Sequence, residues 1–86
     1  MKIRIRGKFW QFKREILSDA RGTCDPPNAP GKSIVVDANL VGEEELEVVL
    51  HETLHSALWD LDEEAVTETA HDIARVLWKL GYRRVG

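Results

Sequence analysis

Two histidines four residues apart, with a glutamate directly after the first, are the residues of this 86-residue chain whose types and spacing best suit chemistry: His51-Glu52-Thr53-Leu54-His55. Residues four apart on an α-helix lie one turn above each other, so both imidazoles can project from the same side and share one metal ion. Zinc accepts imidazole nitrogen readily, at about 2.0–2.1 Å. The spacing therefore predicts that His51 and His55 are ligands of a zinc ion, Zn2+.

Glu52 has a different predicted role, because it directly follows the first histidine and is expected beside the metal rather than on it. From there its carboxylate can accept a proton from a zinc-bound water, whose pKa the metal lowers toward about 7, and later pass that proton to a leaving amine. The alternative is that His51 and His55 are polar residues flanking the buried stripe of a helix. We predict the metal site, since the alternative leaves both histidines and the acid between them unexplained.

A catalytic zinc site needs a third protein ligand and an open position. The long-spacer HExxHxxGxxH pattern is excluded, because Leu58 and Leu61 stand where glycine and histidine are needed. The candidates lie further along the chain, on the next predicted helix: Glu63, Glu64, Glu68 and His71. Helical phase ranks Glu63 first, on the flank of that helix's apolar arc, and puts the other three on its polar side.

Two observations leave the third ligand open. A tight antiparallel helix hairpin would bring Glu68 closer to the level of the histidines, with Asp72 one turn further on as a supporting acid. Glu63 and Glu64 can also be read as acids of a first helical turn that follow Asp62 and stabilise the helix start.

The strands that precede these helices are predicted from period-two alternation and turn residues. Ile3 and Ile5 alternate with Arg4 and Arg6, and aromatic residues follow, so residues 2–17 predict a strand pair or a bent strand around Arg6-Gly7-Lys8. Glycines and prolines predict a loop over residues 22–31. The β-branched run Ser33–Asp37 predicts a short strand.

Two helices complete the predicted fold. The first runs from Glu43 to Trp59, with one apolar stripe inward: Leu46, Val49, Leu50, Leu54, Ala57 and Leu58. Asp60-Leu61-Asp62 is a turn that ends in an N-cap residue, and the second helix runs from about Glu63 to Leu80 and stops at Gly81. Its predicted inward residues are Val66, Ala70, Ile73, Leu77 and Leu80. The fold class is therefore α+β, as a single small domain over residues 1–86.

Composition narrows the function classes. The chain is 43% hydrophobic and 31% charged, which is ordinary for a globular protein, and its net charge of −3 argues against a grip on phosphate backbone, so no nucleic acid is expected. Residues 2–14 hold six cations and no acid; we interpret them as a solvated strand face, with an acidic partner as the alternative. A single cysteine and the lack of any long apolar run predict a cytoplasmic protein with no membrane association.

Several other residues have weaker claims to function. Cys24 is read as a half-buried structural thiol rather than an inhibitory zinc ligand. Tyr82 is expected to pack on the helices rather than to bind an oxyanion, and His71 to lie on the surface. The tryptophans are expected in the core and at its rim: Trp10, Trp59 and Trp78.

The motif His51-Glu52-Thr53-Leu54-His55, followed by a short turn and Glu63-Glu64-Ala65-Val66, resembles the minimal gluzincin-like zincins, in particular short stand-alone metallopeptidases of phages and bacteria. Gly22-Thr23-Cys24-Asp25-Pro26-Pro27 and Leu80-Gly81-Tyr82-Arg83 are similar to such chains as well. The resemblance covers about residues 22–84. It implies a zinc site made by the two histidines and an acid from the next helix, with Glu52 as general base. It also implies an edge strand beside the active-site helix that holds an extended peptide, for which Ile34-Val35-Val36 is the matching segment.

The function expected from these residues is a zinc metallopeptidase that acts on a peptide or protein. So small a domain has little wall for substrate pockets, so we expect narrow specificity, or a cleft completed by a partner or a second copy. The alternative is a zinc-stabilised binding or regulatory module without turnover. A third reading is a zinc-free helical interaction domain that uses the basic strand.

Overall fold

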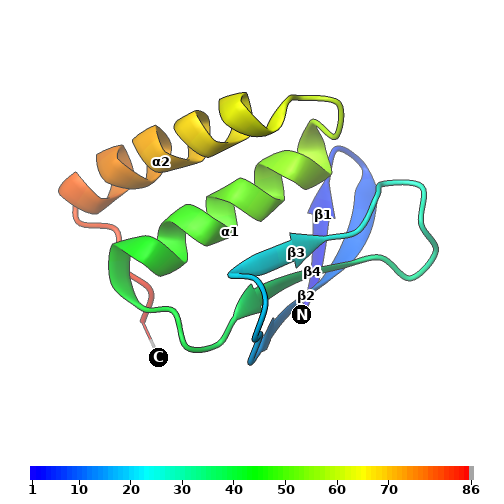
Figure 1. Cartoon of the computed structure of the whole chain (residues 1–86), viewed down its shortest axis with the longest axis horizontal. Coiled ribbons are helices and arrows are strands. Elements are labelled where there is room, and N and C mark those ends of the chain that lie inside the picture. Colours follow the sequence, from blue (N-terminus) through cyan, green and yellow to red (C-terminus); the bar gives the residue numbers. More distant parts are fainter. Residues whose placement is uncertain (86) are drawn as a thin grey trace.

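The computed structural model describes residues 1–85 and confirms the α+β class, with strands first and helices second. Four strands form one mixed sheet in the order β1-β2-β4-β3, and α1 lies on one face of that sheet with α2 beyond it (Figure 1). The elements are β1 (Lys2–Ile5), β2 (Lys8–Glu15), β3 (Gly22–Cys24), β4 (Ser33–Asp37), α1 (Gly42–Ala57) and α2 (Glu63–Lys79).

The N-terminal segment is an antiparallel hairpin, the first of the two predicted alternatives. Arg6 and Gly7 form its two-residue turn, with φ of 49° and 79°. Positive φ at both central residues gives a turn whose twist matches that of the flanking strands, which is why glycine is favoured there. Arg6 also donates a hydrogen bond to the carbonyl of Ala57 at 2.8 Å. The hairpin turn is thereby joined to the carboxyl end of α1, where a cation is favoured.

The basic segment of residues 2–14 is only partly the solvated strand face that was predicted. Lys2, Arg4 and Lys13 are exposed, and the Lys2 ammonium lies 4.2 Å from the centre of the Phe9 ring. Arg14 turns instead toward α1, where its Nε donates to the Glu45 carboxylate at 3.1 Å. The alternation of the strand explains this, since residue 14 shares a face with the buried aromatic residues of β2.

The predicted loop over residues 22–31 is wrong at its start, because Gly22–Cys24 form β3, antiparallel to β4. Three residues are too few for an alternation signal, and the strand exists because its backbone pairs with Ser33–Asp37. β4 itself is confirmed, but β2 lies on its other side in a parallel pair, so β4 is interior. The expectation that Ile34-Val35-Val36 is the edge strand is therefore wrong, and the edge beside α1 is β3.

The helices match the predicted segments with small shifts at their ends. α1 begins at Gly42 and ends at Ala57, so Trp59 lies beyond it. α2 begins after Asp62, whose carboxylate accepts a hydrogen bond from the amide of Ala65 at 2.8 Å, and it ends before Gly81, where φ is 92°. Neither helix is both long and apolar enough to cross a membrane, within residues 1–85.

The inward faces of both helices differ in part from the prediction. α1 buries Glu45, Val48, Glu52 and Ser56, while the predicted stripe is half-buried and Leu58 is 44% exposed. α2 packs on α1 and, within the described residues, not on the sheet. It buries Val66 and Ala70 as predicted, but Ala74 in place of Ile73 and Leu80. For α1 the reason is its position as the middle layer: it contacts the sheet on one side and α2 on the other, so buried residues occur on more than one face of the helix. The main core lies beneath α1: Trp10, Phe12, Ile34, Val36, Leu40 and Val48.

Candidate metal centre

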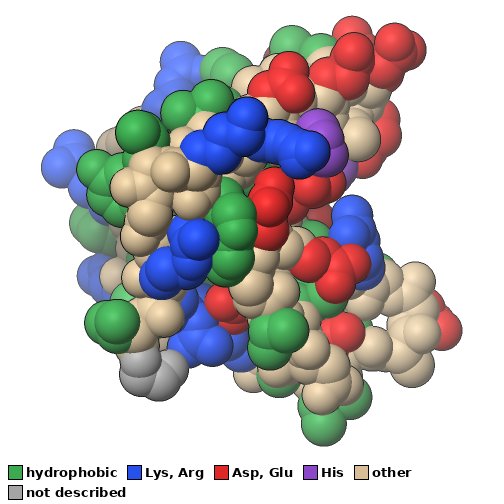
Figure 2. Space-filling model, turned by 90° about the vertical axis from the view of Figure 1, so that its left-hand side faces the viewer, with side chains coloured by type: hydrophobic (Ala, Val, Ile, Leu, Met, Phe, Trp, Pro, Cys, Tyr) green, Lys and Arg blue, Asp and Glu red, His purple; other side chains and the backbone are tan. Residues whose placement is uncertain are grey.

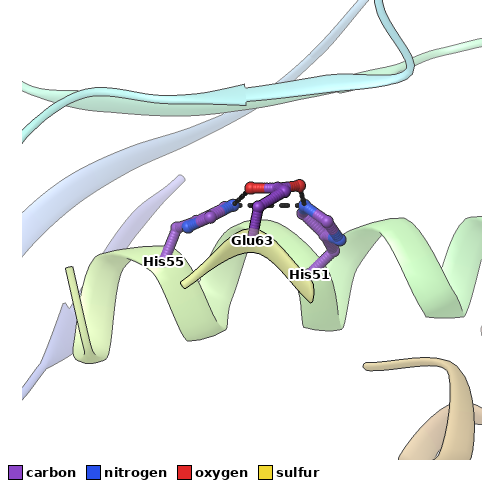
Figure 3. A group of neighbouring side chains, drawn as sticks. All are labelled: His51, His55 and Glu63. Carbon is purple, nitrogen blue, oxygen red and sulfur yellow. Dashed lines mark hydrogen bonds and ion pairs between the residues drawn. The ribbon is translucent and has the colours of Figure 1, made fainter. Parts of the chain in front are cut away.

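Three side chains from two helices meet at one point of the molecule. His51 and His55 come from the second half of α1, and Glu63 is the first residue of α2 (Figure 3). The His51 Nε2 atom lies 2.9 Å from Glu63 Oε1, and the His55 Nε2 atom lies 2.9 Å from Glu63 Oε2. The two Nε2 atoms are 3.1 Å apart. The sequence prediction that these residues share one site therefore agrees with the geometry.

The chain reversal between the helices brings Glu63 to the histidines. The amide of Leu58 donates to Leu54 at 2.8 Å and the amide of Leu61 donates to Leu58 at 2.9 Å, which closes a compact turn after α1. Asp62 then caps α2, so that the first helical residue faces back across α1. The placement of Glu63 follows from the geometry of this turn.

The other candidates for the third ligand do not join this group. The His71 Nδ1 atom lies 3.0 Å from Glu47 Oε1, in a pair that connects α2 to α1 away from the two histidines. Glu64 and Glu68 are exposed on α2, and the possible metal-binding group within the described residues consists of His51, His55 and Glu63.

The donor atoms of this group suit a zinc ion. Ligand atoms about 2.0–2.1 Å from a tetrahedral zinc lie about 3.3 Å from each other. The two Nε2 atoms, 3.1 Å apart, are close to that spacing, each lies 2.9 Å from a different oxygen of Glu63, and one ligand atom from each residue lies within 4.8 Å of the others. If both imidazoles donated N–H groups to Glu63, the contact between the two Nε2 atoms would join two donors, whereas a cation among the three groups would be favourable for all of them. Two nitrogens and one carboxylate also leave a fourth position open.

Glu52 lies beside this group in a buried position. Glu52 as a whole is 8% exposed. Within residues 1–85, its carboxylate makes no hydrogen bond or ion pair. Burial raises the pKa of Glu52; the charges of His51 and His55 act in the opposite direction, and the Glu63 carboxylate adds to the rise. A carboxylate that lines the cleft and makes no hydrogen bond within residues 1–85 is suited to exchange a proton with a molecule bound in that cleft.

These residues line one cleft of about 330 Å³: Gly22, Cys24, His51, Glu52, His55, Trp59 and Glu63. Figure 2 shows that the surface is hollowed on one side between α2 above and the strands below, with Asp and Glu side chains gathered over α2. The ring centre of Trp59 lies 6.3 Å from that of His55, and Trp59 is 44% exposed. Trp59 thus forms an apolar wall at the mouth of the cleft, consistent with the predicted rim position.

The opposite wall of the cleft comes from β3, which the sequence analysis did not foresee. Cys24 is half-buried, its thiol lies 3.4 Å from the Asp25 carbonyl, and it is not part of the three-residue group. Burial, with added repulsion from Glu52 and Asp25, raises the pKa of the Cys24 thiol to about 12. The thiol is therefore neutral near pH 7, as expected for a structural cysteine. Glycine in a short extended segment often marks a close approach of another group, and Gly22 is the signal that could have revealed this wall.

A larger groove, of about 480 Å³, lies at the other end of α1 and does not contain the metal-binding group. Its lining includes Trp78, Tyr82 and the Glu45 carboxylate, which accepts hydrogen bonds from Arg14 and Arg84. Arg14 and Arg84 thus form ion pairs with Glu45, and the Arg83 guanidinium lies 3.3 Å from the centre of the Trp78 ring. Tyr82 lies at this groove by the amino end of α1 rather than at the cleft, but it is 62% exposed, so the predicted packing on the helices is at most partial.

Comparison of the chain with protein-family models, with curated proteins and with solved structures gives no match. The functional assignment that follows therefore rests on the geometry and chemistry of the site.

Proposed function

We propose that this protein is a zinc-dependent metallopeptidase, with His51, His55 and Glu63 as metal ligands and Glu52 as general base. One observation carries the proposal: three zinc-type donors lie within 4.8 Å of one another, in a cleft that is also lined by the largely buried residue Glu52. A closed structural zinc site takes four protein ligands. The group found here has three, which favours the peptidase over a zinc-stabilised binding module.

The chain's own residues have separate tasks in this proposal. When bound, zinc supplies Lewis-acid chemistry: it polarises a carbonyl and makes a water molecule more acidic. Glu52 accepts the proton of the attacking water at its carboxylate and delivers it to the nitrogen of the leaving amine. The packing of Glu52 in α1 holds that carboxylate at the cleft.

The substrate is proposed to be an extended peptide that lies along β3. This strand pairs with β4 on one side only, so its other edge can offer backbone hydrogen bonds to an added strand. β3 lines the cleft through Gly22 and Cys24, and Trp59 offers an apolar contact opposite. In this proposal the edge strand that holds the extended peptide is Gly22–Cys24 rather than Ile34-Val35-Val36.

The function is tested by metal content and hydrolysis measured on the same preparation. We expect the purified chain to bind one zinc ion, to cleave members of a mixed peptide library, and to lose cleavage on chelation. Glu52→Gln should keep the zinc and lower kcat by about 10²–10⁴-fold, because the amide has the same shape but cannot accept the proton. His55→Ala is the matched variant that should lose the metal as well. Hydrolysis by Glu52→Gln at the rate of the unaltered protein would contradict the role given to Glu52.

A further inference from the structure

The backbone of Gly22 lies so close to the side chain of Glu52 that a residue with a Cβ atom would not fit there unless its neighbours moved. A Cβ atom added at position 22 would lie 2.9 Å from Glu52 Cγ, 3.0 Å from Glu52 Oε2 and 2.9 Å from Val48 Cγ1. Carbon atoms in ordinary contact are about 3.5–4.0 Å apart. Gly22 does not have a positive φ, so its backbone conformation is open to other residues. Glycine is required at this position for space.

The side chain of Glu52, which lies next to Gly22, has few other contacts that fix its position. Glu52 makes no hydrogen bond or ion pair within residues 1–85, so packing rather than polar contacts sets the position of its carboxylate. One side of that packing is the bare backbone of β3 at Gly22. The open side is the cleft, which His51, His55 and Glu63 also line. A group that pushed Glu52 away from β3 would move it toward the metal-binding residues.

We propose that Gly22 is a positioning residue. Because Gly22 has no side chain, the Glu52 carboxylate can lie against β3, where it can exchange a proton. In that position Glu52 does not become a further metal ligand. The consequence for hydrolysis rests on the proposed peptidase function. The positional part concerns only where the carboxylate lies relative to the metal, so it can be measured without any substrate.

Cobalt(II) is the probe for that position, because its visible absorption weakens as the number of ligands rises. In Gly22→Ala the displaced carboxylate should join the metal, and the visible absorption of the cobalt-loaded protein should fall. Where hydrolysis is measured, kcat should fall by about tenfold or more with KM changed by less than about twofold, since the base is misplaced while the peptide-binding edge remains.

Truncation of Glu52 separates this role from a merely structural one. If the displaced carboxylate causes the spectral change, then Gly22→Ala in a Glu52→Ala background should leave the cobalt spectrum as it is in Glu52→Ala alone. A general disturbance of β3 would change the spectrum in both backgrounds and would overturn the proposal. Thr23→Ala is the matched control on the same strand; its side chain is exposed, and the cobalt spectrum should not change.

Thermal unfolding gives a readout that needs neither metal nor substrate. Gly22→Ala should lower the unfolding temperature, and most of that loss should disappear in the Glu52→Ala background, where two of the three close contacts are gone. If Gly22→Ala alone does not fold, the double variant should. Equal losses in both backgrounds would refute direct control of Glu52 by Gly22, because the contact with Val48 is common to both.

The failure of this proposal differs from the failure of the proposed function. A protein that binds cobalt but cleaves no peptide would refute the peptidase. The cobalt spectra of the unaltered protein, of Gly22→Ala, of Glu52→Ala and of the double variant would still decide the role of Gly22. Conversely, an active peptidase in which Gly22→Ala keeps the unaltered spectrum and kcat would refute the role of Gly22 alone.

Discussion

At the scale of single residues, Glu63 and Glu64 provide a natural comparison. They are adjacent, carry the same charge and begin the same helix, yet only Glu63 lies at 2.9 Å from both histidines. Successive residues on a helix point about 100° apart, so one residue faces α1 and its neighbour faces solvent. A role in helix-dipole stabilisation is common to both residues, whereas only Glu63 is placed to take the proposed role of metal ligand.

This comparison predicts that Glu63→Gln weakens zinc binding while Glu64→Gln does not. The amide of glutamine keeps the size of the side chain and removes the charge, so the loss of one ligand should cost about tenfold or more in zinc affinity, the range seen when even supporting groups are removed. Glu64→Gln should stay within about threefold. Competition with a chromophoric chelator measures both, and an equal loss in the two variants would assign the effect to general charge.

At the scale of elements, the site depends on where α2 begins. Asp62 accepts the Ala65 amide at 2.8 Å and thereby fixes Glu63 as the first helical residue. α1 is fixed independently, because it packs on the sheet and its carboxyl end accepts a hydrogen bond from Arg6 of the β1–β2 turn. The two halves of the metal-binding group are thus held by different contacts, and the turn of residues 58–62 joins them.

We therefore expect Asp62→Ala to affect both stability and metal binding. Loss of an N-cap costs about 0.5–2 kcal/mol, and a frayed first turn would release Glu63 from the histidines, so zinc affinity should fall with the free energy of unfolding. Asp60→Ala in the same turn is the control; Asp60 is exposed, so its removal should change stability by less than about 0.5 kcal/mol. Urea unfolding with and without zinc measures these effects. Equal destabilisation by the two variants would disprove the role of the cap.

At the scale of the whole molecule, a buried carboxylate joins the sheet, α1 and the C-terminal segment. Glu45 is 6% exposed and accepts hydrogen bonds from Arg14 of β2 at 3.1 Å and from Arg84 at 3.0 Å. Burial alone would raise the pKa of Glu45, but the hydrogen bonds and charges of Arg84 and Arg14 outweigh it, and the pKa lies below its ordinary value of 4.5. Glu45 is the buried member of this group, since the side chains of Arg14 and Arg84 are 33% and 49% exposed, so the two arginines compensate the burial of its charge.

The lowered pKa gives a pH dependence with a definite sign. A carboxyl group whose pKa is lower in the folded chain contributes stability above its unfolded pKa, near 4.5, and this contribution is lost as the pH falls through the folded value. The unfolding temperature of Glu45→Gln should therefore be well below that of the unaltered protein at pH 7, and the gap should narrow as the pH falls below about 4. Thermal scans from pH 7 to pH 3 measure it. Glu47→Gln, also on α1 but near the surface, should show a smaller gap at pH 7. A gap for Glu45→Gln that did not change with pH would contradict the assignment.

Sequence by itself determined the parts of this protein that depend on near neighbours in the chain. The four-residue spacing of His51 and His55 placed both rings on one side of a helix, Arg6-Gly7-Lys8 indicated a turn or bend between strands, and Asp62 indicated a helix start. These features follow from local backbone geometry and short-range hydrogen bonds, so they could be predicted without knowledge of the rest of the fold.

Only the tertiary structure decided the contacts between distant segments. The order of the strands put β3 rather than β4 at the edge, and the close approach of that edge to α1 brought Gly22 against Glu52, thirty residues further along the chain. The packing of α2 on α1 likewise selected Glu63 from several acids that the sequence left open. Such contacts depend on how whole elements pack, and hydrophobic periodicity tells which face of a helix is apolar but not which partner covers it.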